Sequence, residues 1–490
     1  MKKMVRTYGL WIKGKEVKGS SGKVFPTLNP TTEQPLAYFH QGTGKDIDNA
    51  VKAAIEAQKK WSEVPAPHRG EILLNIAQIL KKRKQELGKL VSTEMGKILT
   101  EGCGDVQEAI DIFEYMAGEG RRLFGHTTPS ELQHKMCFTQ RQPLGVVGLI
   151  TPWNFPFAIP AWKIAPALIC GNGIVFKPSS DTPLCAWGLV QICQEAGVPS
   201  GVINMVTGQG EEAGTHLIQH PHVQGISFTG SRAVGEFVVK HAGLKKVGLE
   251  LGGKNPIILM DDADIDLALE GIMFGSFGTT GQRCTATSRL IIHKDIFNEV
   301  EEKVLKRTNK LKVGNPLYSD TQMGPLIARR AVEKTHKYIE IGKKENAKLL
   351  TGGEPLKGKG FFYKPTIFTN VKPTMRIAQE EIFGPVLSLI KAQNFDDAIQ
   401  ICNGVEYGLS ASMYTRDITK AMYAIEKMES GIVYINAPTI GAEVHLPFGG
   451  IKKTGNGTRE AGLEGIHEFS ETKTVFIDYS QRLQKAQGIK

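Results

Sequence analysis

Residues 226–235 read Ile-Ser-Phe-Thr-Gly-Ser-Arg-Ala-Val-Gly, an apolar run followed by turn residues and a helical pattern. The apolar run 226–229 predicts a strand, Gly230 and Ser231 predict a turn, and a helix is expected over 232–241. The free N–H groups and positive dipole end of a helix N-terminus suit a pyrophosphate, and glycines permit close approach of backbone to ligand. The pattern by itself is equally compatible with a tight strand–helix turn that binds nothing.

Similar units surround this segment. Strands are predicted at 145–150, 174–177, 202–206, 226–229, 247–251, 256–260 and 290–293, and helices at 182–196 and 232–241. This alternation predicts an α/β protein with a parallel sheet covered on both faces. It resumes more weakly over 290–440, which indicates a second α/β lobe, with a boundary near 245–250 inferred from topology.

Composition and charge exclude several classes of protein. The 490 residues are enough for two or three domains, and 41% hydrophobic with 22% charged residues is ordinary for a globular protein. The net charge of +10 is spread along the chain, so nucleic-acid binding is not expected. The densest basic run, residues 81–84, is expected at the solvated end of an amphipathic helix. The N-terminus lacks an apolar signal region, and no apolar run approaches a membrane span.

The cysteines and histidines show no metal-binding pattern. Cysteines occur at 103, 137, 170, 185, 193, 284 and 402, with neither C-x-x-C pairing nor metal-ligand spacing. We therefore expect no metal site, and a reduced, cytoplasmic protein whose cysteines are mostly small core residues. His216 and His220 have helical metal-site spacing, but no carboxylate pattern accompanies them and Pro221 breaks the helix. With His222 they are expected to be surface histidines.

One cysteine differs from the others in its neighbours. Residues 281–285 read Gly-Gln-Arg-Cys-Thr, and such small and polar residues are typical of an accessible thiol. Because the thiolate is the competent nucleophile, Cys284 is a candidate nucleophile. The alternative, a structural cysteine, is more typical of apolar runs such as the one around Cys170.

Two polar residues next to predicted strands are candidates for roles in catalysis. Glu250 lies inside an apolar strand, and a buried carboxylate must be paired or have a raised pKa, which makes it a general-base candidate. The alternative is a structural ion pair with Lys254 or another cation. Asn154 follows the strand at 145–150 and can donate an amide hydrogen bond to a developing oxyanion. The alternative there is a turn-forming asparagine.

Seven segments in order along the chain together resemble the aldehyde dehydrogenase superfamily, and the resemblance spans nearly all residues. They are 152–156 (Pro-Trp-Asn-Phe-Pro), 177–180 (Lys-Pro-Ser-Ser), 228–231 (Phe-Thr-Gly-Ser), 250–254 (Glu-Leu-Gly-Gly-Lys), 281–284 (Gly-Gln-Arg-Cys), 381–385 (Glu-Ile-Phe-Gly-Pro) and 447–450 (Pro-Phe-Gly-Gly). The resemblance implies a Rossmann-type parallel-sheet cofactor domain at 1–120 and 143–247, and a catalytic α/β domain at 248–465. It also implies an oligomerisation element at 121–142 and 466–490, in a homodimer or homotetramer.

The resemblance implies NAD(P)+-dependent oxidation of a small-molecule aldehyde to a carboxylic acid. Cys284 would attack the aldehyde to give a thiohemiacetal and then a thioester. The amide of Asn154 and the backbone N–H of Cys284 would hold the oxyanion, and Glu250 would activate the hydrolytic water. Lys163 and Glu460 match a proton path leading from Glu250. The presence of Glu250 favours hydrolysis to the free acid over transfer of the acyl group to coenzyme A.

The resemblance also implies the cofactor contacts. They are Trp153, Lys177, Ser179, Ser180, Gly230, Ser231, Gly235, Glu381 and Phe383. Lys177 would bind the adenosine ribose, Trp153 and Ser231 the pyrophosphate, and Glu381 the nicotinamide ribose, with Phe383 near it. Relatives that prefer NAD+ often have a glutamate where this chain has Ser180. A 2′-phosphate meets no repulsion from Ser180, so acceptance of NADP+ is expected.

The substrate channel is expected to be mostly apolar, with loop 437–446 contributing to it. Its predicted lining is Phe155, Ile159, Trp162, Arg283, Thr285 and Phe448. Arg283 can bind a carboxylate in bidentate fashion, and the sequences at 281–285, 441–443 and 454–457 resemble branches that act on acidic semialdehydes, including α-ketoglutaric semialdehyde. Three alternatives stay open. Arg283 can pair structurally away from the pocket, the channel can serve a broad range of aldehydes, or the fold can belong to a non-catalytic relative.

Overall fold

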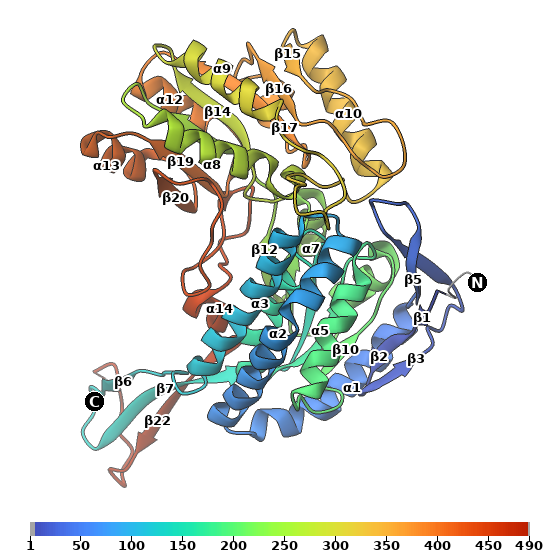
Figure 1. The fold of residues 1–490 in the computed structure, drawn as a ribbon. Helices are drawn as coiled ribbons and strands as arrows, with labels where there is room; N and C mark the ends of the chain where they lie inside the picture. The colour runs from blue at the N-terminus through green and yellow to red at the C-terminus, as the bar shows by residue number, and fades with distance from the viewer. Residues whose placement is uncertain (1–4, 489–490) are drawn as a thin grey trace.

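Two seven-stranded sheets organise residues 5–488, which are the residues that the computed structural model describes (Figure 1). The first has the order β12-β11-β8-β9-β10-β2-β3, and the second has the order β15-β16-β17-β14-β13-β19-β20. Strands β8 to β12 pair in parallel, as do the six strands of the second sheet other than its edge strand β15. The predicted α/β class with two parallel-sheet lobes is confirmed.

The first sheet contains the strands predicted around residues 226–235. Its strands are β2 (Leu10–Ile12), β3 (Lys15–Val17), β8 (Val146–Ile150), β9 (Gly173–Lys177), β10 (Ile203–Met205), β11 (Gly225–Thr229) and β12 (Lys246–Glu250). Its helices are α1 (Gly44–Glu63), α2 (Ala66–Glu94), α3 (Leu99–Glu119), α4 (Ala158–Ile169), α5 (Pro183–Glu195), α6 (Thr215–Gln219) and α7 (Arg232–His241), with a π-helical turn, η1 (Gly210–Gly214). Every residue of β8 and β9 is buried, as expected for parallel strands covered on both faces.

The second sheet begins directly after β12. Its strands are β13 (Asn255–Leu259), β14 (Thr287–His293), β15 (Lys348–Thr351), β16 (Thr366–Thr369), β17 (Val386–Ala392), β19 (Ser410–Tyr414) and β20 (Ile432–Ile435). Its helices are α8 (Ile265–Phe277), α9 (Phe297–Thr308), α10 (Arg329–Lys344), α11 (Arg376–Gln379), α12 (Phe395–Asn403) and α13 (Ile418–Lys427), with the 3₁₀ turn η2 (Gly278–Gly281). The chain passes from one sheet to the other between residues 250 and 255, a few residues after the predicted boundary.

Three small sheets complete the fold. The first contains β1 (Thr7–Tyr8), β5 (Pro35–His40) and β4 (Val24–Leu28). The second pairs β18 (Tyr407–Gly408) with β21 (Ile451–Lys452). The third contains β22 (Ser470–Asp478), β7 (Lys135–Pro143) and β6 (Thr127–Pro129). The last sheet joins two segments far apart in sequence and projects from the first lobe beyond α14 (Gly462–Glu468) (Figure 1). No helix of the described residues is long and apolar enough to cross a membrane.

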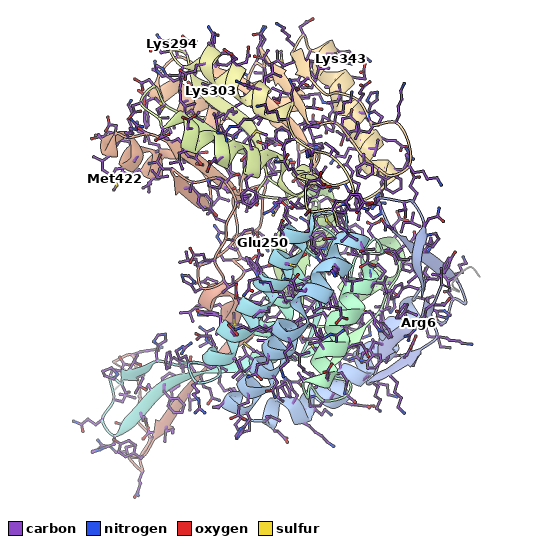
Figure 2. All side chains as sticks on the ribbon, viewed as in Figure 1. Arg6, Glu250, Lys294, Lys303, Lys343 and Met422 are labelled. Atoms are coloured by element: carbon purple, nitrogen blue, oxygen red, sulfur yellow. The ribbon has the colours of Figure 1, made fainter. Side chains whose placement is uncertain are left out.

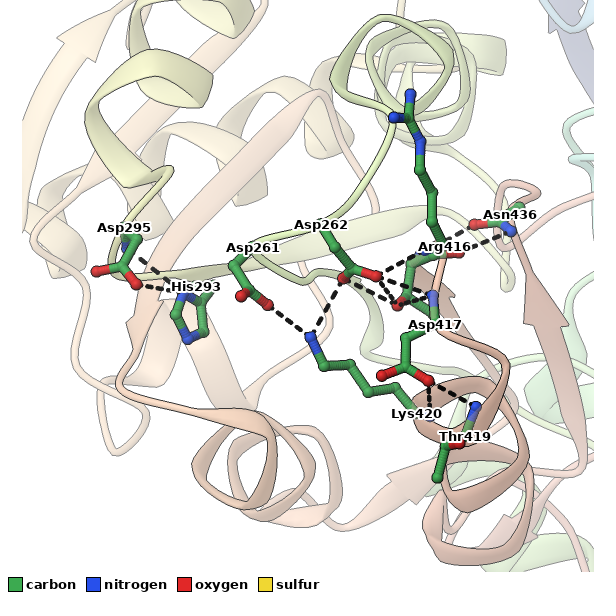
Figure 3. Close-up of polar contacts among 10 residues, drawn as sticks. Asp261, Asp262, His293, Asp295, Arg416, Asp417, Thr419, Lys420 and Asn436 are labelled. Atoms are coloured by element: carbon green, nitrogen blue, oxygen red, sulfur yellow. Dashed lines mark hydrogen bonds and ion pairs between the residues drawn. The ribbon is translucent and has the colours of Figure 1, made fainter.

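A polar cluster holds the carboxyl end of the second sheet together (Figure 3). Asp262, which follows β13, accepts hydrogen bonds from the Thr415 hydroxyl at 2.8 Å and from the backbone N–H groups of Arg416 and Asp417 at 2.9 and 2.8 Å. Lys420 donates to Asp261 at 2.7 Å. These bonds tie the loop after β13 to the loop after β19. The opposite, amino end of the sheet stays available for a site.

Two surface predictions are wrong in detail. The basic run 81–84 lies in the middle of α2 and not at its end, because the helix continues to Glu94. His220 is buried, with 8% of its surface exposed, because it packs against the rings of His216 and His222 and lies 3.4 Å from Asp48 of α1. His216 is more exposed and contacts Asp48 at 2.7 Å.

Candidate active site

The carboxyl end of the first sheet meets the amino end of the second, and the predicted site residues gather at this junction. Asn154 follows β8, Ser231 follows β11, and Glu250 ends β12. Cys284 precedes β14. Figure 2 labels Glu250, which lies where the two lobes join.

A cavity of about 440 Å³ opens at this junction. It is lined by Pro152, Trp153, Asn154, Ile159, Thr229, Gly230, Ser231, Leu251, Gly252, Cys284, Ile327, Arg330, Ala331, Lys334, Glu381 and Phe383. Five of the predicted cofactor contacts are among them: Trp153, Gly230, Ser231, Glu381 and Phe383. The four lining residues from 327 to 334, in and before α10, were not predicted, because no local pattern in that helix differs from an ordinary basic surface helix.

A second, smaller cavity of about 70 Å³ lies on the other side of Cys284. All six residues predicted for the substrate channel line it: Phe155, Ile159, Trp162, Arg283, Thr285 and Phe448. Glu250, Glu460 and the unpredicted Glu108 also reach it. Cys284 lines both cavities, as do Ile159, Thr229 and Leu251, so the two cavities adjoin at this residue.

A strained turn presents Cys284. Thr279 and Thr280 have left-handed backbone angles, φ 50° and 58°, and Gly281 follows with φ 69°. A Cβ at 281 would lie 2.3 Å from the carbonyl oxygen of Gly384, so only glycine fits. Each left-handed threonine costs about 1–2 kcal/mol, and the surrounding contacts must offset that cost.

Side-chain hydrogen bonds hold this turn in place. The Asn154 Nδ2 donates to the Gln282 carbonyl at 3.1 Å, while its Oδ1 is buried without a partner. Gln282 is fully buried and accepts from the Ile327 N–H at 3.0 Å. The Asn154 amide is therefore fixed beside the backbone that leads into Cys284.

Burial and charge set the ionisation of Cys284. Burial, followed by the carboxylates of Glu381 and Glu250, raises the pKa of the Cys284 thiol to about 12. A thiol with this pKa is neutral at pH 7, so a base or a cationic group must act before it becomes a thiolate.

Glu250 is a buried carboxyl group without a partner. It is 3% exposed, and neither oxygen accepts a hydrogen bond from any described residue. Burial and the neighbouring Glu460 carboxylate raise its pKa well above the usual value. The alternative of a structural ion pair with Lys254 is wrong, because the Lys254 Nζ is itself buried without a hydrogen-bond partner. An unpaired carboxyl beside a cavity can exchange a proton with a ligand.

Lys163 and Glu460 form an ion pair behind Glu250. Lys163, fully buried on α4, contacts the Glu460 carboxylate and donates to the Ser227 hydroxyl at 2.7 Å. Glu460 also lines the smaller cavity. The two residues lie near Glu250, because the charges of both act on its pKa.

The other predicted cofactor residues do not line the large cavity. Lys177, Ser179, Ser180 and Gly235 are absent from its lining. Lys177 is buried, and burial lowers its pKa to about 8. The Ser180 hydroxyl donates to the Gly208 carbonyl at 2.9 Å. Ser179 contacts Asp181, which forms an ion pair with Arg330 of the cavity lining.

Arg283 is paired and yet reaches the small cavity. Its guanidinium donates to Glu101 at 3.2 Å and to the Thr279 hydroxyl at 2.9 Å. It also lies 5.2 Å from the centre of the Phe155 ring. With 12% of its side chain exposed, Arg283 borders the cavity with a charge that Glu101 partly neutralises.

Within residues 5–488, no group of three or more His, Cys, Asp or Glu side chains is placed to hold a metal ion. All seven cysteines lack a disulfide, and five of them are buried. The prediction that the cysteines are mostly buried is confirmed.

The chain is similar to known proteins over almost its whole length. The sequence profile of the "Aldehyde dehydrogenase family" matches residues 17–475. The α-ketoglutaric semialdehyde dehydrogenase of Bacillus subtilis is 43% identical over 96% of this chain and 98% of that protein, and aldehyde dehydrogenase 1A1 of Mesocricetus auratus is 41% identical over 94% and 93%. The crystal structure of betaine aldehyde dehydrogenase from Staphylococcus aureus in complex with NAD+ is 34% identical, covers 97% of this chain and 95% of that chain, and has a TM-score of 0.95. The chain belongs to the aldehyde dehydrogenase family.

Proposed function

We propose that this protein oxidises an acidic semialdehyde to a carboxylic acid with NAD+ or NADP+ through a thioester on Cys284. The observation that carries the proposal is the position of Cys284 between two cavities, with Asn154 and Glu250 beside it. Oxidation of an aldehyde through a thiohemiacetal requires a nucleophilic thiol that can reach both the substrate and a hydride acceptor. Family membership supports NAD(P)+-dependent aldehyde oxidation.

The chain's own residues can carry the acyl chemistry. The Cys284 thiol gives its proton to a base, for which the neighbouring Glu250 is the candidate, and the sulfur bonds to the aldehyde carbon. The aldehyde oxygen, which becomes negative, accepts a hydrogen bond from the Asn154 amide and from the Cys284 N–H. After oxidation, Glu250 removes a proton from water, whose oxygen attacks the thioester carbon and displaces the Cys284 sulfur. Because the pKa of Glu250 is raised, it is a stronger base than an ordinary carboxylate.

The large cavity fits a nicotinamide dinucleotide. The N-terminus of α7 at Ser231 has no side-chain cap, so its N–H groups can bind a pyrophosphate. Glu381 offers a carboxylate for a ribose, and Trp153 with Phe383 forms an aromatic wall with ring centres 5.5 Å apart. When bound, the cofactor accepts a hydride from the substrate carbon. With Ser180 in place of a carboxylate, acceptance of NADP+ as well as NAD+ is part of the proposal.

Two observations favour an acidic semialdehyde. Arg283 borders the small cavity, and a substrate carboxylate there can bind its guanidinium. Relatives from three organisms at 40–43% identity are named as dehydrogenases of α-ketoglutaric semialdehyde or 2,5-dioxopentanoate. A broad-range aldehyde dehydrogenase is the second candidate, favoured by the apolar rings of Phe155, Trp162 and Phe448 in the same cavity and by the similarity to aldehyde dehydrogenase 1A1.

The first experiment follows nicotinamide reduction by the purified protein. NAD+ and NADP+ are crossed with acetaldehyde, benzaldehyde, succinic semialdehyde and α-ketoglutaric semialdehyde, with Cys284→Ala and Cys103→Ala assayed in parallel. We expect the highest kcat/KM with an acidic semialdehyde, loss of at least about 10³-fold in Cys284→Ala, and wild-type rates in Cys103→Ala. Higher kcat/KM for both neutral aldehydes would favour the broad-range function, and unchanged turnover in Cys284→Ala would contradict the thioester mechanism.

We further propose that the lobe of residues 1–120 and 143–247 holds the cofactor and that 248–465 is the catalytic domain. Segments 121–142 and 466–490 would form an oligomerisation element in a homodimer or homotetramer. The seven unpaired thiols support a reducing compartment such as the cytoplasm.

A further inference from the structure

Two arginines in the first turn of α10 connect the second lobe to the first (Figure 1). Arg329 forms an ion pair with Glu33 at 3.1 Å, and Arg330 forms one with Asp181. More than half of each arginine side chain is exposed, and ion pairs of that kind contribute little stability. A cation in the first turn of a helix also opposes the positive end of the helix dipole. Stability therefore does not explain why arginine occupies both positions.

The two arginines differ in what they face. Arg330 lines the large cavity, and Arg329 does not. Lys334, four residues after Arg330, lies on the same face of α10 and also lines the cavity. Lys334 is near Glu381, because its charge opposes the rise that burial causes in the pKa of that carboxyl. The face of α10 that lines the cavity thus carries two cations, one near Glu381 and one paired with Asp181.

Asp181 belongs to the loop between β9 and α5, which also contains Ser179 and Ser180, the residues expected to meet a 2′-phosphate. The Ser179 hydroxyl lies 3.4 Å from the same carboxylate oxygen that Arg330 contacts. The Asp181 N–H donates to the Ser179 hydroxyl at 3.2 Å, and the Thr27 hydroxyl donates to the Asp181 carbonyl at 3.1 Å. These bonds fix the loop. Arg330 therefore connects the cavity to a loop whose serines do not line it themselves.

The charge of Asp181 opposes the binding of NADP+ unless a cation neutralises it. A 2′-phosphate carries a charge of about −1.5 to −2 at pH 7, and a carboxylate beside Ser179 repels it. Arg330 supplies the neutralising charge. Its guanidinium has five N–H donors, and the ion pair with Asp181 is the only polar contact that its side chain makes with residues 5–488. The remaining donors are free to bind phosphate oxygens, which suit the planar guanidinium.

We propose that Arg330 recognises the 2′-phosphate of NADP+ and sets how tightly this protein binds NADP+ relative to NAD+. Its N–H groups donate to the phosphate oxygens, while its positive charge still offsets that of Asp181. NAD+ has a neutral hydroxyl at this position and needs neither contribution. The inference rests on the proposed function and deepens it, because it assigns the cofactor preference to a residue of the second lobe. Arg330 holds the adenosine end of the cofactor and takes no part in the acyl chemistry at Cys284.

Direct binding tests this without turnover. Isothermal titration calorimetry gives Kd values for NADP+ and NAD+, and for adenosine 2′,5′-bisphosphate and 5′-AMP, which carry the adenosine end alone. We expect Arg330→Gln to raise the Kd of NADP+ and of the bisphosphate at least about tenfold, because hydrogen bonds between charged groups are lost. The Kd of NAD+ and of 5′-AMP should change less than about threefold, because for them only an exposed ion pair is removed. Asp181→Asn removes the repulsion and should lower the Kd of NADP+ about threefold.

Two controls separate recognition of the phosphate from other effects. Arg329→Gln breaks a comparable ion pair between the lobes without touching the cavity, and should leave all four Kd values unchanged. Arg330→Gln in the Asp181→Asn background removes the guanidinium where no carboxylate needs neutralising. A weaker binding of NADP+ in this double variant supports direct contact with the phosphate, and unchanged binding would overturn it.

The remaining outcomes distinguish the inference from the proposed function. An unchanged ratio of the NADP+ and NAD+ Kd values in Arg330→Gln would overturn the role of Arg330 alone, as would an equal change of the ratio in Arg329→Gln. Wild-type protein that binds NAD+ but not NADP+ would also overturn it and leave aldehyde oxidation with NAD+ standing. Wild-type protein that binds neither dinucleotide would instead contradict the proposed function.

Discussion

Glu108 is a carboxyl of the small cavity that no sequence motif indicates. It lies on α3 and lines the cavity together with Arg283. Burial and the charge of Asp105 raise its pKa to about 7, while Arg283 and Lys97 act in the opposite direction. Below pH 7 the neutral carboxyl can donate a hydrogen bond to a substrate carboxylate. Above pH 7 the ionised form repels that carboxylate.

The ionisation of Glu108 should make the binding of an acidic substrate weaker as the pH rises. For an acidic semialdehyde we expect KM to rise about fivefold as the pH increases through the pKa of Glu108, about 7, because binding then brings two negative charges together. The KM of benzaldehyde should not share this rise, and Glu108→Gln should abolish it. Steady-state kinetics at a series of pH values measures both. Equal pH dependence for the two aldehydes would show that Glu108 does not contact the substrate carboxylate.

At the scale of elements, the turn before β14 positions the nucleophile. The backbone of residues 279–281 has left-handed φ angles throughout. The Asn154 side chain donates a hydrogen bond to the turn, and the Gly384 carbonyl oxygen packs where a side chain at position 281 would be. The α8 helix ends immediately before this turn, and β14 begins three residues after Cys284. The turn therefore determines the direction in which the Cys284 sulfur points.

Gly281→Ala tests this dependence. An alanine at 281 must adopt a left-handed backbone conformation, which costs about 1 kcal/mol of stability. Its Cβ would also lie 2.3 Å from the Gly384 carbonyl oxygen, so the turn must shift and move Cys284. Gly243→Ala is the matched control, because Gly243 has a similar φ of 66° and no atom within 4 Å of an added Cβ. We expect kcat/KM to fall at least about 10²-fold in Gly281→Ala and to stay within about twofold in Gly243→Ala. Equal activity of the two variants would contradict the positioning role.

At the scale of the whole molecule, the sheet β6-β7-β22 projects from the first lobe (Figure 1). Phe124, Met136, Phe476, Ile477 and Tyr479 are exposed on or beside it. Apolar side chains gathered on a protruding sheet are typical of a surface that binds another protein chain. This agrees with the proposed oligomerisation element.

Phe476→Asp is expected to reduce the assembly to a smaller species, because it places a charge in the proposed interface. Tyr318→Asp is the matched control: Tyr318 is 65% exposed, as Phe476 is at 64%, but lies in the second lobe. Light scattering coupled to gel filtration measures the mass at micromolar concentration. An unchanged mass in Phe476→Asp, or an equal decrease in Tyr318→Asp, would argue against an interface at this sheet.

Local sequence was sufficient for the parallel strands between residues 145 and 293 and for the helices α5 and α7. The seven predicted strands and two predicted helices all exist, with ends within three residues of those predicted. Their signals are periodicity and turn residues, which act between neighbours in the chain. Cys284, Glu250 and Asn154 could be singled out in the same way, since polar residues next to apolar strands are conspicuous. The five N-terminal strands β1 to β5 were not predicted; β1, β2 and β3 have only two or three residues each, too few for a periodic pattern.

The sequence by itself therefore determined the α/β architecture and the candidate nucleophile, base and oxyanion donor. Only the tertiary structure decided which residues share a site. Arg283 meets Glu101 across 182 positions, Lys163 meets Glu460 across 297, and the Glu468 carboxyl fills the space that Gly248 leaves. Glu108 and Arg330 reach the cavities from helices with no distinguishing pattern. The physical reason is that burial, pKa and pairing depend on atoms brought together by packing, whereas periodicity records the contacts of a residue with its neighbours along the chain.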